Sequence, residues 1–135
     1  MNKKITAIGT IILLLTIGSI FAPIVSSIER EHGTIDAELG RRGNERPIVF
    51  LNGSYHTRNR YLIVGGTAKT DDHLGRFRGI FSGNRFIIRI NFGGSIFTLV
   101  GKCRFDRENQ TFIGAWVGRS FPIRGWIIGT YTPLN

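Results

Sequence analysis

Basic side chains two residues apart are the clearest chemical signal in the chain, for example Arg76 and Arg78 in GRFRG and Lys102 and Arg104 in GKCRF. Residues i and i+2 of an extended strand point to the same face, so each pair places two positive charges on one side of a sheet. Arginine binds phosphate, sulfate and carboxylate groups through paired hydrogen bonds. The spacing therefore favours a face that binds anions.

A two-residue turn at Gly83-Asn84 brings more positive charge to the same face. Such a turn fixes the pairing of the strands beside it, which puts Arg78 opposite Arg89. Extending the sheet to the preceding strand puts Lys69 opposite Arg78 as well. Directly opposed like charges destabilise a sheet, and a bound anion would remove that cost.

A second turn, at Gly93-Gly94, puts Arg85 opposite Lys102 in the same way. The predicted anion-binding residues are Lys69, Arg76, Arg78, Arg85, Arg89, Lys102 and Arg104. The alternative is an ordinary solvated face, on which water or the loop acids Asp71 and Asp72 screen the charge.

The elements that hold these residues are predicted to be strands, because apolar and polar residues alternate between glycine-rich turns. Shifting the chain by 35 residues matches Phe77 with Phe112 and Arg89 with Arg124. This match predicts a duplicated three-strand unit. Glycines next to aromatic residues, as in FIGAW, leave space into which neighbouring rings fold.

We expect an all-β fold, an antiparallel meander of about seven strands that forms a small up-and-down barrel or a sandwich. The predicted strands are residues 48–55, 60–69, 76–82, 85–92, 95–105, 111–117 and 121–131. In the last hairpin, a turn at Gly118-Arg119 puts Trp116 opposite Phe121.

Residues 1–27 have the composition of an export signal. Two lysines precede a long apolar run that begins at Ile5, and small residues follow it. The run is almost long enough to cross a membrane, so an uncleaved anchor helix is the alternative to a cleaved signal. In both cases we expect a secreted or cell-surface protein, attached to a membrane only through this segment.

Residues 28–46 are rich in charge and poor in aromatic residues, which predicts a flexible tether before a β-domain at 47–135. The β-domain has twelve Lys and Arg against four Asp and Glu, so it carries +8 of the chain's net +9. This charge favours an anionic polysaccharide, a glycan or a lipid head group as partner. Nucleic acid fits poorly, because the aromatic residues fall on the face opposite the arginines.

The last predicted hairpin is apolar on both faces, and its outer side carries Ile113, Trp126 and Ile128. A strand that is apolar on both sides favours cover by another surface. These three residues are therefore predicted partner contacts, either to a second copy of the chain or to a sugar. The alternative is that the preceding tether covers the tryptophan.

Other motifs offer less chemistry. Asn52 and Asn109 each begin an N-x-[ST] sequence near a predicted bend, so both are candidate N-glycosylation sites. The single cysteine, Cys103, is in phase with inward-facing residues and is expected to be a buried free thiol, with an intermolecular disulfide as the alternative. It is the only titratable side chain of the predicted interior, and no catalytic residue, metal site or cofactor is assigned.

The sequence thus predicts an exported β-domain, non-enzymatic on balance, that binds an anionic surface polymer or head group through a basic face. Two alternatives stay open. One is a structural cell-surface subunit that self-associates through the apolar C-terminal hairpin, and the other is a small β-barrel enzyme.

Overall fold

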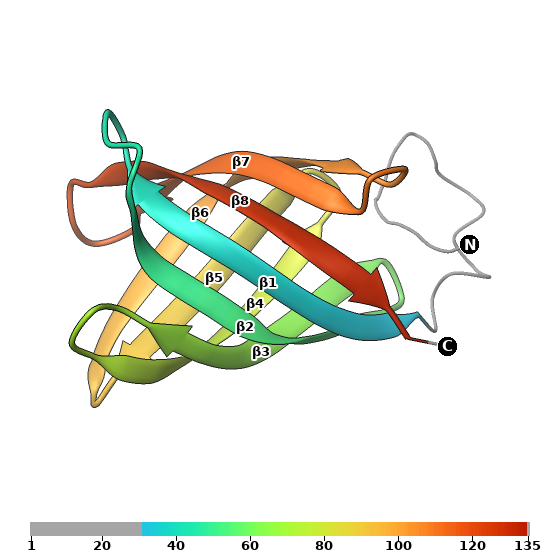
Figure 1. Ribbon diagram of the computed structural model, residues 1–135, viewed down its shortest axis with the longest axis horizontal. Coiled ribbons are helices and arrows are strands. Elements are labelled where there is room, and N and C mark those ends of the chain that lie inside the picture. Colours follow the sequence, from blue (N-terminus) through green and yellow to red (C-terminus); the bar gives the residue numbers. More distant parts are fainter. Residues whose placement is uncertain (1–30, 135) are drawn as a thin grey trace.

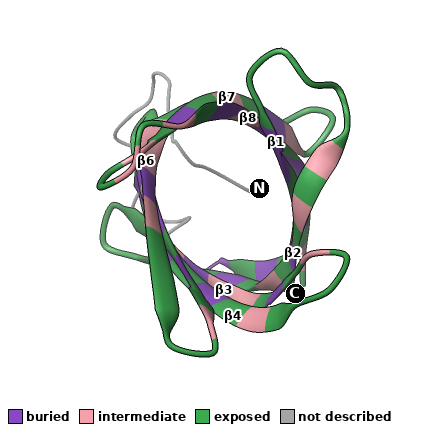
Figure 2. Ribbon diagram, turned by 90° about the vertical axis from the view of Figure 1, so that its left-hand side faces the viewer, coloured by how far each residue is buried: buried purple, intermediate pink, exposed green. Residues whose placement is uncertain are grey.

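Buried and exposed side chains alternate along each strand of the protein, which places one set of residues inside a barrel and the other set outside. The computed structural model describes residues 31–134. Eight antiparallel strands follow one another round the barrel in chain order, and the last pairs with the first (Figure 1). Viewed from its end, the barrel is a closed ring (Figure 2).

The strands are β1 (His32–Arg41), β2 (Pro47–Arg58), β3 (Tyr61–Lys69), β4 (Leu74–Ser82), β5 (Arg85–Phe92), β6 (Ser95–Asp106), β7 (Thr111–Gly118) and β8 (Arg124–Pro133). The prediction of an all-β antiparallel meander is confirmed, and of its two forms the protein adopts the up-and-down barrel. The described residues contain no helix long and apolar enough to cross a membrane. The predicted signal or anchor at residues 1–27 lies outside the described part of the chain.

Strand β1 corrects two predictions, the flexible tether at residues 28–46 and the count of seven strands. Its inward residues Ile35, Ala37 and Leu39 are buried, and acidic residues alternate with them on the outer side. Strand β1 pairs with both β2 and β8 and so closes the barrel. Of the charges that suggested a tether, Asp36, Glu38 and Arg41 lie on the exposed face of this strand.

The two glycine turns are confirmed. Strand β4 ends directly before Gly83-Asn84 and pairs with β5 so that Phe81 lies opposite Phe86, and the Gly93-Gly94 turn joins β5 to β6 in the predicted register. Gly83 and Gly93 have φ values of 63° and 61°. This left-handed conformation is readily available to glycine.

Two other predicted registers are wrong by four residues. Lys69 lies opposite Leu74 and not opposite Arg78, because the β3–β4 turn consists of residues 70–73 alone. A shift by an even number of residues leaves each side chain on its predicted face. The error therefore moves Lys69 along the outer surface without turning it inward.

The last hairpin has the second register error. Trp116 lies opposite Gly125 and not opposite Phe121. Pro122 has no N–H to donate to a strand ladder, and the Phe121 ring packs against Gly118 instead. Phe121 is thus a loop residue, and the sequence repeat has no structural counterpart at this point.

The first part of the repeat does correspond in the structure. Strands β4 and β7 are matched by the 35-residue shift, and both Phe77 and Phe112 point into the core from them. The glycines between the aromatic residues have the predicted role: a Cβ on Gly125 would overlap the Trp116 ring. Glycine on one strand therefore makes room for a ring on the next.

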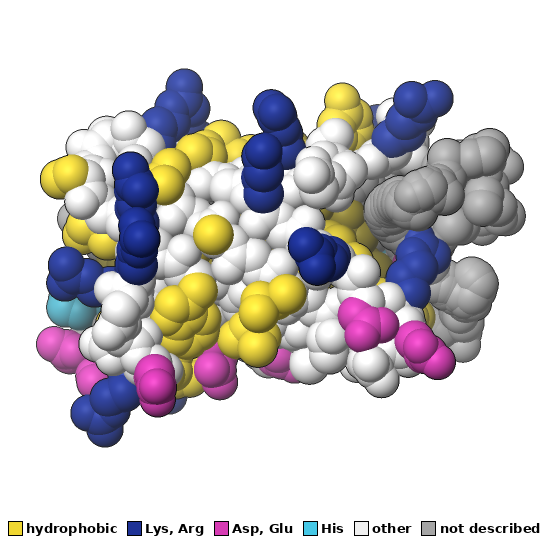
Figure 3. Space-filling view, turned by 90° about the horizontal axis from the view of Figure 1, so that it is seen from above, with side chains coloured by type: hydrophobic (Ala, Val, Ile, Leu, Met, Phe, Trp, Pro, Cys, Tyr) yellow, Lys and Arg dark blue, Asp and Glu magenta, His cyan; other side chains and the backbone are white. Residues whose placement is uncertain are grey.

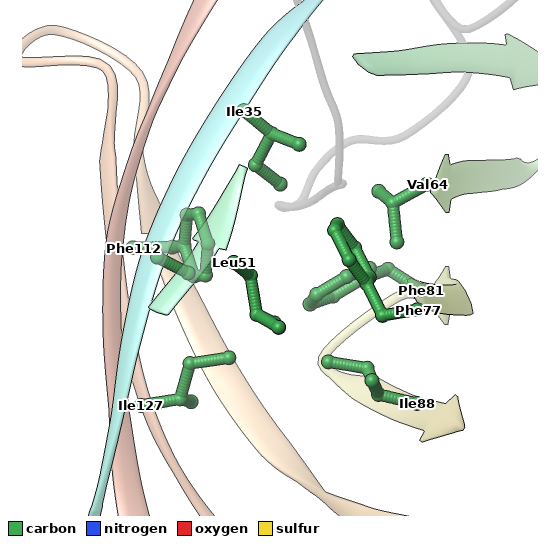
Figure 4. Close-up of a pocket in the computed structure, with 9 residues that line it drawn as sticks. Ile35, Leu51, Val64, Phe77, Phe81, Ile88, Phe112 and Ile127 are labelled. Atoms are coloured by element: carbon green, nitrogen blue, oxygen red, sulfur yellow. The ribbon is translucent and has the colours of Figure 1, made fainter. Parts of the chain in front are cut away.

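The barrel interior is packed with hydrocarbon side chains that meet near the axis (Figure 4). The Phe81 ring lies 5.3 Å from the ring of Phe86, 5.7 Å from that of Phe105 and 5.9 Å from that of Phe112, measured between ring centroids. The cavity drawn in Figure 4 has a volume of about 10 Å³, which is room for about one water molecule. The interior is thus a filled core.

Cys103 belongs to this core and is a buried free thiol, as predicted. Burial raises the pKa of the Cys103 thiol well above its ordinary value. The neutral thiol therefore behaves as a small apolar side chain. A disulfide to a second chain would require the barrel to open.

Candidate anion-binding face

Strands β4, β5 and β6 carry six of the seven predicted anion-binding residues on the outside of the barrel. Arg78 lies directly opposite Arg89, and Arg85 lies directly opposite Lys102. We call these the two cationic pairs. Side chains in such positions have Cβ atoms about 5 Å apart, so each pair can reach a single anionic group.

The remaining predicted residues extend the positive surface without joining a pair. Lys69 lies at the end of β3 opposite Leu74, diagonal to Arg76 on β4. Arg104 lies opposite Ile113. These three basic side chains are exposed, as are those of the cationic pairs.

Acidic side chains are placed elsewhere. The outer positions of β4 and β5 hold four arginines and no carboxylate. Asp36, on β1 across the barrel, accepts a hydrogen bond from the side chain of Asn52. Asp106, at the β6–β7 turn, accepts one from the Asn109 side chain at 2.8 Å. The outer charges of β4 and β5 are thus all positive, whereas β6 carries Asp106 at its end, beyond Lys102 and Arg104.

The predicted partner contacts divide into two kinds. Ile113 and Ile128 lie directly opposite each other and are 58% and 44% exposed. Trp126 is half-buried, its ring packs over Gly40, and its indole N–H donates to the carbonyl of Asn44 at 2.8 Å. The two isoleucines are therefore free for contact, whereas the β1–β2 loop holds the tryptophan.

Figure 3 looks onto the side of the barrel that is uppermost in Figure 1, over β7 and β8. Lys and Arg side chains stand singly on this side, with hydrophobic atoms between them, and Asp and Glu side chains gather along one edge. Positive charge and apolar surface are thus interleaved, and most acidic groups lie along one edge, where Lys and Arg side chains also occur.

The candidate glycosylation sites lie in different settings. Asn109 is in the exposed β6–β7 turn, as expected. Asn52 is in the middle of β2, opposite Asp36 and Thr67, which corrects its placement near a bend. Both asparagine side chains are exposed, and both donate to a neighbouring aspartate.

Two buried phenols were missed by the sequence reasoning. Tyr55 and Tyr131 point inward at the end of the barrel where the chain ends lie, with ring centroids 6.0 Å apart in an edge-to-face contact. Glu31 is buried near them. They correct the prediction that Cys103 is the only titratable residue of the interior. The alternation along β2 and β8 carried the signal, because both tyrosines are in phase with core positions.

Burial raises the pKa of both phenols, against the opposing effect of the nearby Arg107 charge. A phenol is neutral at pH 7 even without this shift, so two uncharged rings close this end of the core. The Tyr55 hydroxyl has no hydrogen-bond partner within the described residues. In the same part of the chain, no three His, Cys, Asp or Glu side chains come together as a metal site would require.

No family model, curated protein or solved structure matches this chain. The fold and the site define a class: an eight-stranded up-and-down barrel with a filled apolar core and a basic outer face on β4 to β6. A fold of this kind does not imply a function. The function must be argued from the outward side chains.

Proposed function

We propose that the barrel is an exported binding module that holds anionic groups of a surface polymer or of lipid heads against its basic face. The observation that carries the proposal is the pairing of Arg78 with Arg89 and of Arg85 with Lys102. Each opposed like-charge pair costs about 0.2–1 kcal/mol in a sheet. A phosphate, sulfate or carboxylate group between the two side chains offsets that cost.

The chemistry of the pairs suits such groups. Each guanidinium offers a planar fork of N–H donors that matches two oxygens of a phosphate or sulfate. The charge also attracts anions before contact, and dissolved salt weakens this attraction because the screening length falls to about 8 Å at physiological ionic strength. Binding should therefore depend strongly on salt.

Charge reversal tests the proposal. We expect the double variant Arg78→Glu, Arg89→Glu to bind dextran sulfate at least about a hundredfold more weakly at low salt, since each basic side chain near an anionic surface contributes about 1 kcal/mol. The opposed pair stays a like-charge pair, so the fold should be unaffected. The measurement is retention on immobilised dextran sulfate as a function of salt concentration.

A second double variant supplies the control. Arg41→Glu with Arg42→Glu changes the net charge by the same amount, but these residues lie at the end of β1 and in the next loop, away from the cationic pairs. We expect this control variant to be retained on dextran sulfate nearly as strongly as the original protein. Equal losses in the two variants would show that only net charge matters, and the proposed face would be abandoned.

Self-association is the second candidate, favoured by the exposed and directly opposed Ile113 and Ile128. If these residues form an interface between copies, Ile113→Thr with Ile128→Thr should convert an oligomer to a monomer in sedimentation velocity experiments. An original protein that already sediments as a monomer at high concentration would eliminate this candidate.

A further inference from the structure

Five aliphatic side chains form an unbroken row across the outside of the barrel. Each lies directly opposite the next on the neighbouring strand, from β3 to β7. This aliphatic row consists of Ile63, Ile80, Ile87, Val100 and Val117. Neighbouring strands lie about 4.8 Å apart, so the row follows the curved wall of the barrel for about 19 Å.

The two cationic pairs flank the aliphatic row on both sides. On β5, Arg85, Ile87 and Arg89 follow one another at alternate positions, so the aliphatic side chain lies between two arginines. On β4, Arg78 lies next to Ile80 on one side of the row, and on β6, Lys102 lies next to Val100 on the other side. The middle of the aliphatic row therefore lies between the two cationic pairs.

The aliphatic row is partly open to solvent: Ile80 is 43% exposed and Val117 is 40% exposed. Outward-facing positions in a water-soluble sheet are usually polar. A row of β-branched aliphatic residues between arginines therefore favours a ligand that offers apolar surface and negative charge together.

The aliphatic row also ends near the point where the chain enters the barrel. Ile63 lies opposite His56, and His56 lies opposite His32, the first residue of β1. The segment that precedes His32 contains the long apolar run from Ile5. If that run stays in a membrane, the few residues between it and His32 limit how far the membrane can be from this end of the aliphatic row.

We infer that the aliphatic row and the cationic pairs together form a docking surface for a bilayer that contains anionic phospholipids. The inference rests on the proposed function and names its ligand. The arginines and Lys102 bind lipid phosphates, and Ile80, Ile87 and Val100, the middle of the aliphatic row, enter the apolar zone beneath the head groups. This division of roles is the usual one for proteins that lie on a membrane surface.

Charge argues against the other occupants. A second copy docked through the same surface would bring its own Arg78, Arg89, Arg85 and Lys102 against these cations, and the like charges would repel. A soluble polyanion would pair with the cations but would leave the aliphatic row in water. The bilayer is the partner that uses both features.

The experiment uses the full chain and vesicles of phosphatidylcholine with or without phosphatidylglycerol, separated by flotation. Vesicles without phosphatidylglycerol measure whatever the apolar N-terminal segment contributes. We expect Ile80→Thr with Ile87→Thr to weaken binding to the anionic vesicles about tenfold, because two apolar contacts are lost. Retention on dextran sulfate should not change, since the cationic pairs are intact.

A matched control exists on the same barrel. Ile48 is 39% exposed, much as Ile80 is, but it lies on β2, which contributes no residue to the aliphatic row. Ile48→Thr should therefore leave vesicle binding unchanged. Threonine keeps the β-branched shape at positions 48, 80 and 87, and a thermal melt confirms that each variant folds.

The outcomes separate the two proposals. If the Ile80, Ile87 variant floats with anionic vesicles as well as the original protein, the bilayer inference is overturned, while dextran sulfate retention still decides the proposed function. If the original protein binds neither anionic vesicles nor dextran sulfate, both the proposed function and the bilayer inference are wrong. The variant Ile87→Trp gives an independent readout: brominated lipids should quench its added fluorescence on anionic vesicles. An absence of added quenching would also contradict the inference.

Discussion

Proline at position 37 is expected to unfold the barrel. Ala37 is in the middle of β1, between Leu51 of β2 and Gly129 of β8. Proline cannot donate to a strand ladder and is excluded from central strands. The buried carbonyl left without its donor costs about 1–3 kcal/mol, and the bulk of the ring adds to that. We expect a loss of at least about 3 kcal/mol in the free energy of unfolding, measured by urea denaturation.

A proline in the neighbouring loop is the control that shows whether residues 32–41 behave as a strand or as a tether. Glu45 lies in the β1–β2 loop, outside the ladder, so Glu45→Pro should change the urea midpoint little. If Ala37→Pro were as harmless as Glu45→Pro, residues 32–41 would behave as a tether, and the closure of the barrel by β1 would be wrong.

The second large effect is expected at Gly125. A Cβ at this position would overlap both the Trp116 ring and the carbonyl oxygen of Gly40 on the neighbouring strand. The ring cannot move aside freely, because the Trp116 indole N–H donates to the carbonyl of Trp126 at 2.9 Å. Overpacking of this kind costs about 3 kcal/mol. Gly125→Ala should therefore lower the melting temperature by roughly 12 °C or more.

Gly65→Ala is the matched control. The same added methyl group at Gly65 would lie 3.4 Å from the carbonyl oxygen of Phe77 and 3.9 Å from the Arg78 side chain, which are ordinary contacts. Alanine also restricts the unfolded chain more than glycine does. We expect the melting temperature to stay the same or rise slightly. A similar drop in both variants would mean that glycine at position 125 makes no special room for Trp116.

The parts of the fold that the sequence predicted are those governed by local rules. The turns at Gly83-Asn84 and Gly93-Gly94 each admit one tight geometry, so the register of β4, β5 and β6 followed from counting residues. The turn at 70–73 and the loop around Pro122 have no such constraint. Their lengths depend on the packing of whole strands, which no short motif reveals.

Strand β1 shows a different limit. Ile35, Ala37 and Leu39 do alternate in the sequence, but the charged residues between them gave the segment the composition of a tether. Composition averages over both faces of a strand, whereas burial depends on one face only. The closure of the barrel was therefore hidden by the acidic residues on its outer surface.

The cationic pairs of the candidate site could be predicted from the sequence, because the turns beside them could be predicted. Arg78 opposite Arg89 and Arg85 opposite Lys102 follow from the two glycine turns. The same turns align Ile80, Ile87 and Val100, but the full aliphatic row becomes visible only when the pairings of five consecutive strands are known together. In particular, Ile63 joins the row only in the observed β3–β4 register.

The ends of the barrel chain are neighbours, since the backbone N–H of Leu134 donates to the carbonyl of His32 at 2.8 Å. A short peptide could therefore join them, and the chain could be cut at Gly93-Gly94, in a turn at the opposite end of the barrel. Such a circular permutant would keep every strand pairing. It would, however, carry any membrane-embedded leader about a barrel length away from Ile63, so that tethering and lipid docking could be separated within a single fold.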